Sequence, residues 1–321
     1  MKQFILGVDI GGTNIKIGIF DSETVELIDK IEFKTPKRDQ NQSIFISLKR
    51  EIDQLIKNHK YVYEDIIGLG VAVPCPVKNG YVFSCPNLVW TNLDIVKELQ
   101  KIFPSNIKIS VSNDASLAAL GENESLDVPY KNAVLITLGT GVGGGIIING
   151  NIYEGSVGYG GEIGHIRVFD ENKATCGCGS KGCLEQICGT YGILEYAKEL
   201  AKSSKTSIDM NRLSVKSVFD AAKDGDILAN QVIDRVAKYL AISASILAMI
   251  VDPEVFIIGG GVSRAGSFLI DKIEKYYKSE ARFSSGQVPF ILAKTGNDAG
   301  IIGAAYLINQ QIKKSEKTDA W

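Results

Sequence analysis

The chain alternates short apolar runs with longer stretches of helical periodicity. An apolar run at residues 3–9 breaks into a glycine-rich turn at residues 10–14 and resumes at residues 15–20, which predicts two strands joined by that turn. A similar unit lies at residues 131–148, where the glycine-rich turn spans residues 139–145. Two units of this kind indicate an internal duplication of a βββαβα-type domain within an α/β protein.

The remaining periodicity completes the predicted elements and divides the 321 residues into two domains. We expect a boundary near Asp114, which gives an N-terminal lobe of residues 1–114 and a C-terminal lobe of residues 115–298, with the segment of the last helix, about residues 299–321, returning to the first lobe. The polar tail from residue 313 onward should be frayed. Further helices are predicted at 42–57, 93–102, 115–122, across most of 190–251, and at 265–278 and 299–311; further strands are predicted at 26–34, 67–73, 107–111, 255–258 and 288–293.

The charge and hydropathy patterns exclude several classes of protein. The formal net charge of −2 leaves no basic surface of the kind that binds nucleic acid, so no nucleic-acid partner is expected. The apolar N-terminal run is too short for a signal peptide, and the apolar stretch at 239–251 falls short of the roughly 20 residues that a membrane span requires. We therefore expect a soluble, cytoplasmic protein with reduced thiols and no membrane partner.

Three of the six cysteines and one of the two histidines fall between residues 165 and 183. Thiolate sulfur and imidazole nitrogen are the ligands that tetrahedral zinc prefers, so a closed Cys3His zinc site is predicted. The intervening glycines would allow the positive φ angles that such a loop needs. The alternatives are buried cysteines that act as small hydrophobic residues and, less favoured, a disulfide. With four protein ligands the zinc would be structural, and the predicted ligands are His165, Cys176, Cys178 and Cys183.

Glycine-rich turns at the ends of apolar strands are candidate phosphate sites. Their exposed backbone N–H groups can bind phosphate oxygens, and glycine lets the backbone approach closely. Neither a P-loop motif nor a dinucleotide fingerprint is present. Asp9, at the edge of the first turn, could hold Mg²⁺ directly or through water, or could be a solvated aspartate at a strand end. The turn residues of interest are Gly11, Gly12 and Thr13 in the first turn, Gly139, Thr140 and Gly141 in the second, and Gly260 and Gly261 in a third.

Carboxylates beside these motifs are candidates for acid–base and binding roles. Asp114 follows Asn113 where a predicted strand ends and a helix begins, which is where α/β proteins place reacting groups. Asp114 could act as a general base on a hydroxyl, or it could be a helix N-cap with no further function. Glu162 and Glu185 flank the predicted zinc site, where their carboxylates could fix the hydroxyls of a polyol.

Taken together, the motifs closely resemble the ROK family of sugar kinases, particularly its bacterial glucokinases. The resemblance covers nearly the whole chain and rests on DIGGTNIK at 9–16, NDA at 113–115, LGTGVGGG at 138–145, EIGH at 162–165 and CGCGSKGCLE at 176–185. It implies an actin-like ATPase (ribonuclease H-like) α/β fold, duplicated and two-domain, with a cleft between the lobes. It also implies an ATP- and Mg²⁺-dependent hexose kinase with a structural Zn²⁺, which transfers the γ-phosphoryl group to the sugar 6-hydroxyl and assembles as a homodimer or homotetramer.

The resemblance implies a role for each candidate residue. Asp114 would be the base on the 6-hydroxyl, and His165 would place one ring nitrogen on zinc and the other toward the sugar. The first two glycine turns would cradle the ATP phosphates beside Asp9, and the third would pass near the nucleoside. The other sugar contacts implied are Asn87, Asn113, Glu162 and Glu185.

The chain departs from the family pattern at two positions near the expected sugar. Cys75 stands between two prolines where the family usually has glycine, and Ser116 stands where it commonly has asparagine. Glucose is favoured as the substrate, because relatives that phosphorylate fructose often replace one of the three cysteines with histidine. N-acetylmannosamine, fructose or a β-glucoside are alternative sugars, and polyphosphate is an alternative donor. A sugar-sensing or actin-like ATPase protein without kinase activity is the alternative of another class.

Overall fold

The computed structural model describes residues 2–36, 42–169, 174–281 and 286–319. The chain divides into two compact units. Unit 1 comprises Met1–Pro129, Asn151–Gly160 and Asn297–Trp321, and unit 2 comprises Tyr130–Gly150 and Gly161–Gly296.

Helix α3 (Asp114–Glu124) belongs to unit 1, so unit 1 continues beyond the sequence-based boundary at Asp114. The reason is the close packing of α3 on α9 (Ala299–Asp319). A Cβ placed on Gly303 of α9 would lie 1.8 Å from the backbone oxygen of Leu117 in α3. The helix that begins at Asp114 is therefore fixed to the last helix of the chain, and the two fold as part of the same unit.

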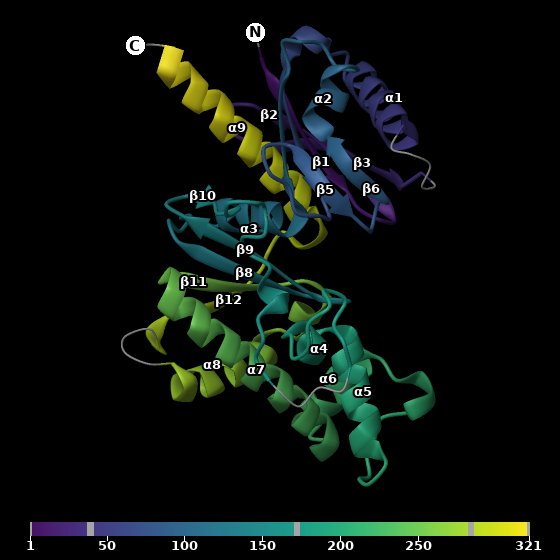
Figure 1. The fold of residues 1–321 in the computed structure, drawn as a ribbon, viewed down its shortest axis with the longest axis vertical. Helices are drawn as coiled ribbons and strands as arrows, with labels where there is room; N and C mark the ends of the chain where they lie inside the picture. The colour runs from purple at the N-terminus through teal and green to yellow at the C-terminus, as the bar shows by residue number, and fades with distance from the viewer. Residues whose placement is uncertain (1, 37–41, 170–173, 282–285, 320–321) are drawn as a thin grey trace. The chain divides into compact units, whose positions relative to one another are not determined.

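Unit 1 is built on a mixed sheet with the strand order β3-β2-β1-β4-β7 (Figure 1). β1 and β2 run antiparallel around the first glycine turn, whereas β4 runs parallel to β1, and β7 runs parallel to β4. The first predicted strand, turn and strand are thus confirmed. The strands are β1 (Phe4–Ile10), β2 (Asn14–Asp21), β3 (Leu27–Lys34), β4 (Ile66–Val73) and β7 (Lys108–Asn113).

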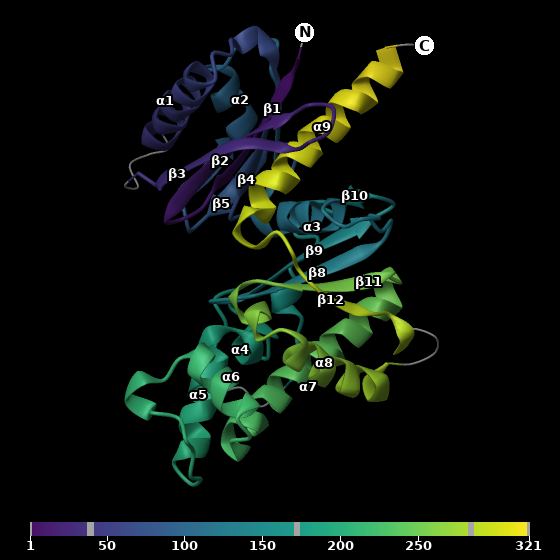
Figure 2. The same cartoon turned by 180° about the vertical axis from the view of Figure 1, so that it is seen from behind.

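Successive side chains of a strand point to opposite faces of the sheet, and this alternation builds the core of unit 1 on both sides. Leu6 of β1 packs in a cluster with Leu48 of α1 (Gln42–Asn58), whereas the neighbouring Ile5 packs with Ile301 of α9. Helices α1 and α2 (Ile95–Gln100) therefore cover one face and α9 covers the other (Figures 1 and 2).

The approach of α9 to the sheet requires glycine in the strands. A Cβ on Gly70 of β4 would lie 1.9 Å from the backbone oxygen of Ala304, so any larger residue would push the helix away. A Cβ on Gly7 of β1 would likewise lie 2.1 Å from the backbone oxygen of Ile301, so the first turn of α9 lies directly against β1. The smaller elements of unit 1 are η1 (Tyr63–Asp65), the hairpin of β5 (Tyr81–Cys85) and β6 (Trp90–Asp94), and β10 (Asn151–Ile152).

Unit 2 repeats the strand arrangement of unit 1. Its strands follow the order β9-β8-β11-β12, in which β8 and β9 are antiparallel while β8, β11 and β12 run parallel. The order β2-β1-β4-β7 in unit 1 has the same directions, so the predicted duplication is confirmed. These strands are β8 (Ala133–Leu138), β9 (Val142–Ile148), β11 (Val255–Gly259) and β12 (Phe290–Leu292).

Helices pack against the sheet of unit 2 and supply most of its core. The longest, α7 (Ile227–Val251), buries residues such as Val236 and Leu240 in the same cluster as Val134 and Ile136 of β8. Within the described parts of the chain, no helix combines the length and the apolar character that a membrane crossing needs. The other helices are α4 (Glu185–Cys188), α5 (Thr190–Ala201), α6 (Val215–Lys223), α8 (Ser267–Glu280), η2 (Ile163–His165), η3 (Met210–Arg212) and η4 (Gly261–Ala265).

One sequence-based prediction of secondary structure is confirmed with shorter bounds, and another is wrong. The helix predicted at 93–102 is α2, which begins only at Ile95 because the Asp94 side chain, at the end of β6, caps it by accepting a hydrogen bond from the Lys97 N–H at 3.0 Å. The tail predicted to fray from residue 313 is helical to Asp319. The buried Ile312 packs on the core of unit 1 directly before this tail, and the helix continues from there.

Candidate active site

The carboxyl ends of three parallel strands meet at one edge of the unit 1 sheet. Asp9 of β1 pairs with Ala72 of β4, and Ala72 pairs with Ser112 of β7. In α/β proteins such an edge is where ligands and reacting groups are placed. The predicted site residues of unit 1 that this edge brings together are Asp9, Asn113 and Asp114, and the loop with Cys75 follows β4 at the same edge.

Asn113 and Asp114 take different structural positions at the start of α3. Asn113 is the N-cap, because its Oδ1 accepts hydrogen bonds from the N–H groups of Ala115 at 3.0 Å and Ser116 at 3.1 Å. Its Nδ2 donates to the backbone oxygen of Cys75 at 3.4 Å. Asp114 is the first residue of the helix, and its Oδ1 accepts from the Ala115 N–H at 2.7 Å. The N-cap of α3 is therefore Asn113 and not Asp114, which had been considered as the cap.

Asp9 carries a perturbed carboxyl group next to the first glycine turn. Burial raises the pKa of Asp9 to about 6, with Lys16 opposing the rise and Glu32 adding to it. A Cβ on Gly300 would lie 2.7 Å from Oδ2 of Asp9, so this carboxylate faces the start of α9. A partly buried carboxylate favours binding a cation, and a single carboxylate with phosphate oxygens and waters is a common Mg²⁺ environment.

The first glycine turn is held by the following strand and lies close to Asn87. The N–H of Gly11 donates to the backbone oxygen of Asn14 at 3.0 Å, and the N–H of Thr35 donates to that of Thr13 at 2.8 Å. A Cβ on Gly12 would lie 3.8 Å from the backbone oxygen of Asn87, whose side chain is exposed between β5 and β6. Unit 1 thus places Asn87 beside the turn that carries Gly11, Gly12 and Thr13.

The two departures from the family pattern lie next to the Asn113-Asp114 pair. Ser116 is buried and donates its N–H to the cap residue Asn113. Cys75 is buried beside Cys85, and its pKa is raised by the hydrogen bond between the two thiols and by burial, with the negative charge of Asp114 adding to the rise. A substitution at Cys75 or Ser116 would therefore change the immediate surroundings of Asp114.

A contact that the sequence pattern did not indicate supports the same strand end. Ser112, directly before Asn113, donates from Oγ to Oε1 of Glu154 at 2.9 Å. Lys78 Nζ lies 3.9 Å from Oε2 of Glu154 and donates to the backbone oxygen of Gly155 at 2.7 Å. These residues come from three separate segments of unit 1, and no local periodicity links them.

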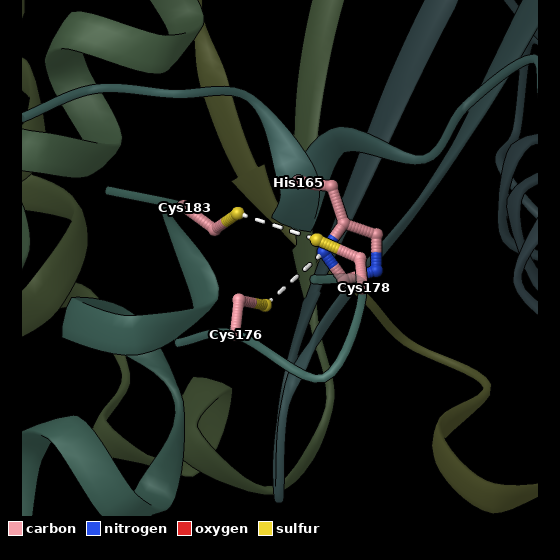
Figure 3. A group of neighbouring side chains, drawn as sticks. All are labelled: His165, Cys176, Cys178 and Cys183. Atoms are coloured by element: carbon pink, nitrogen blue, oxygen red, sulfur yellow. Dashed lines mark hydrogen bonds between the residues drawn. The ribbon is translucent and has the colours of Figure 1, made fainter. Parts of the chain in front are cut away.

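In unit 2 the four predicted zinc ligands converge. Their ligand atoms all lie within 4.8 Å of one another, and the side chains point toward a common centre (Figure 3). Cys176 Sγ lies 3.6 Å from His165 Nδ1, and Cys178 Sγ lies 3.6 Å from Cys183 Sγ. Sulfur ligands around tetrahedral zinc lie about 3.8 Å apart. The donor set and its spacing fit a structural zinc ion.

The backbone of this loop suits metal binding, and its thiols differ in acidity. Gly179 and Gly182 adopt φ values of 88° and 82°, as the pattern predicted for glycines between the cysteines, whereas Gly177 has no positive φ. The N–H of Ser180 is the main cause that lowers the pKa of Cys178 to about 7, and burial raises the pKa of Cys183 to about 12.

Glu162 and Glu185 both lie beside this cluster. Nε2 of His165, the ring nitrogen opposite the cysteines, is 3.9 Å from Oε2 of Glu162. Burial raises the pKa of Glu162, with His165 opposing the rise and the charge of Glu185 adding to it. Glu185 Oε2 accepts a hydrogen bond from the Val142 N–H at 3.1 Å, and Oε1 lies 3.8 Å from Cys176 Sγ. Two carboxylates and an imidazole nitrogen therefore gather where a polyol could bind.

The second and third glycine turns follow parallel strands of unit 2. Gly139, Thr140 and Gly141 join β8 to β9, and the N–H of Gly139 donates to the oxygen of Gly141 at 3.0 Å. Gly260 has φ of 80°, and Gly261 begins η4 directly after β11. These are the turn positions that the sequence marked for phosphate and nucleoside.

Comparison with known proteins agrees with this arrangement. The chain is 38% identical over 326 residues to the glucokinase of Halalkalibacterium halodurans, covering 98% of each protein. The structure of a ROK family glucokinase from Streptomyces griseus in complex with glucose and AMPPNP matches with a TM-score of 0.75 and 30% identity, covering 96% of this chain and 99% of that one. The ROK hexokinase from Thermus thermophilus matches with a TM-score of 0.80 and 26% identity, covering 98% of this chain and 100% of that one. The ROK family profile matches residues 5–311, so this chain belongs to the ROK family and has its actin-like ATPase type of α/β fold.

Proposed function

We propose that this protein is an ATP- and Mg²⁺-dependent hexose kinase, with glucose as its favoured sugar, that transfers the γ-phosphoryl group to the 6-hydroxyl. The observation that carries the proposal is its similarity to glucokinases over almost the full length of both chains. The position of Asp114, whose neighbour takes over the capping task, supports the same reaction.

In this mechanism Asp114 is the general base. Its carboxylate would accept the proton of the 6-hydroxyl while that oxygen forms a bond to the γ-phosphorus, and the bond from phosphorus to the bridging oxygen of ADP breaks. Asn113 would hold the backbone of Asp114 in place through its cap and could still offer one N–H to the sugar. Asn87 would be a further sugar contact from the same unit.

The phosphates would be bound by backbone groups and by one cation. N–H groups of the first two glycine turns other than those of Gly11 and Gly139, which donate within their own turns, would donate to phosphate oxygens, and Asp9 would hold Mg²⁺ directly or through water. When bound, Mg²⁺ neutralises charge on the phosphate oxygens. The turn at Gly260 and Gly261 would lie near the nucleoside.

Unit 2 would orient the remaining hydroxyls. Glu162 and Glu185 would accept hydrogen bonds from the sugar, and His165 would bind zinc through Nδ1 and face the sugar through Nε2. When bound, zinc would supply folding energy and fix His165, because its four positions are filled by protein ligands. Catalysis would then rest on positioning and charge, as is usual for phosphoryl transfer.

The experiment that tests this function measures sugar-dependent ADP release from Mg–ATP across glucose, mannose, fructose, N-acetylglucosamine, N-acetylmannosamine and a β-glucoside. The highest kcat/KM on glucose is expected. A different preferred sugar would keep the kinase reaction and direct attention to Cys75 and Ser116, with Cys75→Gly and Ser116→Asn as the variants to compare. Binding of sugar without ADP release, from ATP or polyphosphate, would indicate a sensor instead. Light scattering of the same sample tests the expected homodimer or homotetramer.

A further inference from the structure

The short segment 185–190 contacts the second glycine turn at several points. Glu185 Oε2 accepts from the Val142 N–H at 3.1 Å. At the other end of the segment, the Thr190 N–H donates to the backbone oxygens of Gly139 at 3.0 Å and Thr140 at 3.2 Å. The Thr190 hydroxyl also donates to the Gly139 oxygen, at 2.9 Å. The backbone of the turn is therefore held from outside its own strands.

The same segment holds the zinc loop. Gln186 Oε1 accepts from the N–H groups of Gly182 at 2.9 Å and Cys183 at 3.2 Å. Its Nε2 donates to the backbone oxygen of Ala174 at 3.1 Å. One side-chain amide thus joins the two ends of the loop that carries the three cysteines.

Glycines make these contacts possible. A Cβ on Gly141 would lie 1.9 Å from Oε2 of Glu185, and one on Gly189 would lie 2.9 Å from the backbone oxygen of Thr140. Gly189 therefore leaves no room for a side chain between the backbones of the segment and the turn, and Gly141 leaves room for the Glu185 carboxylate. A displacement of the segment would be transmitted to the turn, because there is no space between them to absorb it.

We propose that residues 185–190 link the zinc loop structurally to the second glycine turn. In this link Gln186 and Thr190 are positioning residues for nucleotide binding. The proposal rests on the proposed function, in which this turn binds ATP phosphates. The zinc would then set the geometry of the nucleotide side of the site as well as that of His165. Neither Gln186 nor Thr190 contacts a reacting atom; each acts through the backbone it holds.

The test compares Thr190→Val with Thr190→Ser. Valine keeps the shape but removes the hydroxyl that binds Gly139, whereas serine keeps the hydroxyl. Loss of one hydrogen bond that orders the turn should raise the Kd of Mg–AMPPNP about 3- to 10-fold in Thr190→Val, with glucose Kd and zinc content unchanged. Thr190→Ser should retain wild-type affinity, which a role in packing alone would not predict.

The dependence of nucleotide binding on the zinc loop is tested with Gln186→Leu and with zinc-free wild-type protein. Both should weaken Mg–AMPPNP binding, and Gln186→Leu should also lose zinc to a chelator faster than wild type. Wild-type AMPPNP affinity in Thr190→Val, or full AMPPNP affinity in zinc-free protein, would overturn the proposed link between the zinc loop and the turn. Wild-type protein that binds no AMPPNP would overturn the proposed function itself, so the two failures are distinguishable.

Discussion

The two antiparallel glycine turns of the duplicated fold are built alike and held differently. Each joins the first two strands of its sheet, β1 to β2 and β8 to β9. The first turn is held by Thr35, whose N–H and hydroxyl bind the backbone oxygens of Thr13 and Gly11. The second is held by Glu185 and Thr190, which follow the zinc loop.

The turns differ in charge as well. The residue before the last of β1 is Asp9, while the corresponding residue of β8 is Thr137, since Asp9 pairs with Lys16 as Thr137 pairs with Gly143. Only the first copy therefore carries a carboxylate for a cation. Under the proposals above, the two copies would supply different parts of the chemistry: a carboxylate at Asp9 in unit 1 and a zinc-dependent support of the turn in unit 2.

The largest effect is expected in unit 1, at Asp114. Asp114→Asn keeps the shape of the side chain but removes the base, so kcat should fall about 10²- to 10⁴-fold. Glucose affinity and zinc content should remain close to wild type. The matched control is Asp127→Asn, an exposed aspartate of the same unit, which should leave kcat unchanged. An Asp114→Asn variant with undiminished kcat would remove Asp114 from the mechanism.

The largest effect on stability is expected in unit 2. Cys178 is exposed, so without a metal Cys178→Ser would be nearly neutral. If Cys178 binds zinc, the substitution should lower the free energy of unfolding by about 3 to 5 kcal/mol. Denaturant melts with and without added zinc make the measurement. Equal stability of variant and wild type would argue that no ion occupies the cluster.

Substitution of Asp9 should raise the free energy of unfolding, whereas substitution of Cys178 should lower it. Its pKa rises from the usual 3.8 to about 6, so the folded protein holds this proton more tightly than the unfolded chain. The favourable contribution is present below pH 4 and is lost as the pH rises through 6. Asp9→Asn should therefore stabilise the nucleotide-free protein by about 1 to 3 kcal/mol at pH 7.5 and much less at pH 4. Equal effects at both pH values would contradict this account.

A smaller effect is expected at Asn113. Asn113→Ala removes the cap of α3 and should cost about 1 kcal/mol. Asn113→Asp keeps a cap acceptor and should recover that stability, yet it places a second carboxylate beside Asp114. Thermal melts measure the loss of stability in Asn113→Ala. The glucose KM of Asn113→Asp measures the effect of the second carboxylate. If Asn113→Ala were as stable as wild type, the cap would not be what fixes Asp114.

The sequence predicted the features that short stretches determine. The apolar run and turn at β1 and β2 are local, and so is the spacing of Cys176, Cys178 and Cys183. Because parallel strand ends share an edge, the placement of Asn113 and Asp114 at a strand end could also be predicted.

Features that depend on distant partners were not predicted. The contact of Ser112 with Glu154 joins residues 42 positions apart and has no periodic signal. The last turns of α9 look polar in isolation, yet they continue a helix whose buried Ile312 packs on the core of unit 1. The assignment of α3 to unit 1 likewise depends on its contact with Gly303, which appears only once the chain is folded.

The most direct test of the difference between the turns is amide hydrogen exchange before and after zinc removal. We expect amides at 139–145 to lose about tenfold or more of their protection and those at 11–14 to keep theirs. Amides of β11 serve as the control that unit 2 remains folded. Equal loss in both turns, or no loss in either while zinc is gone, would contradict a metal-dependent support that is confined to the second turn.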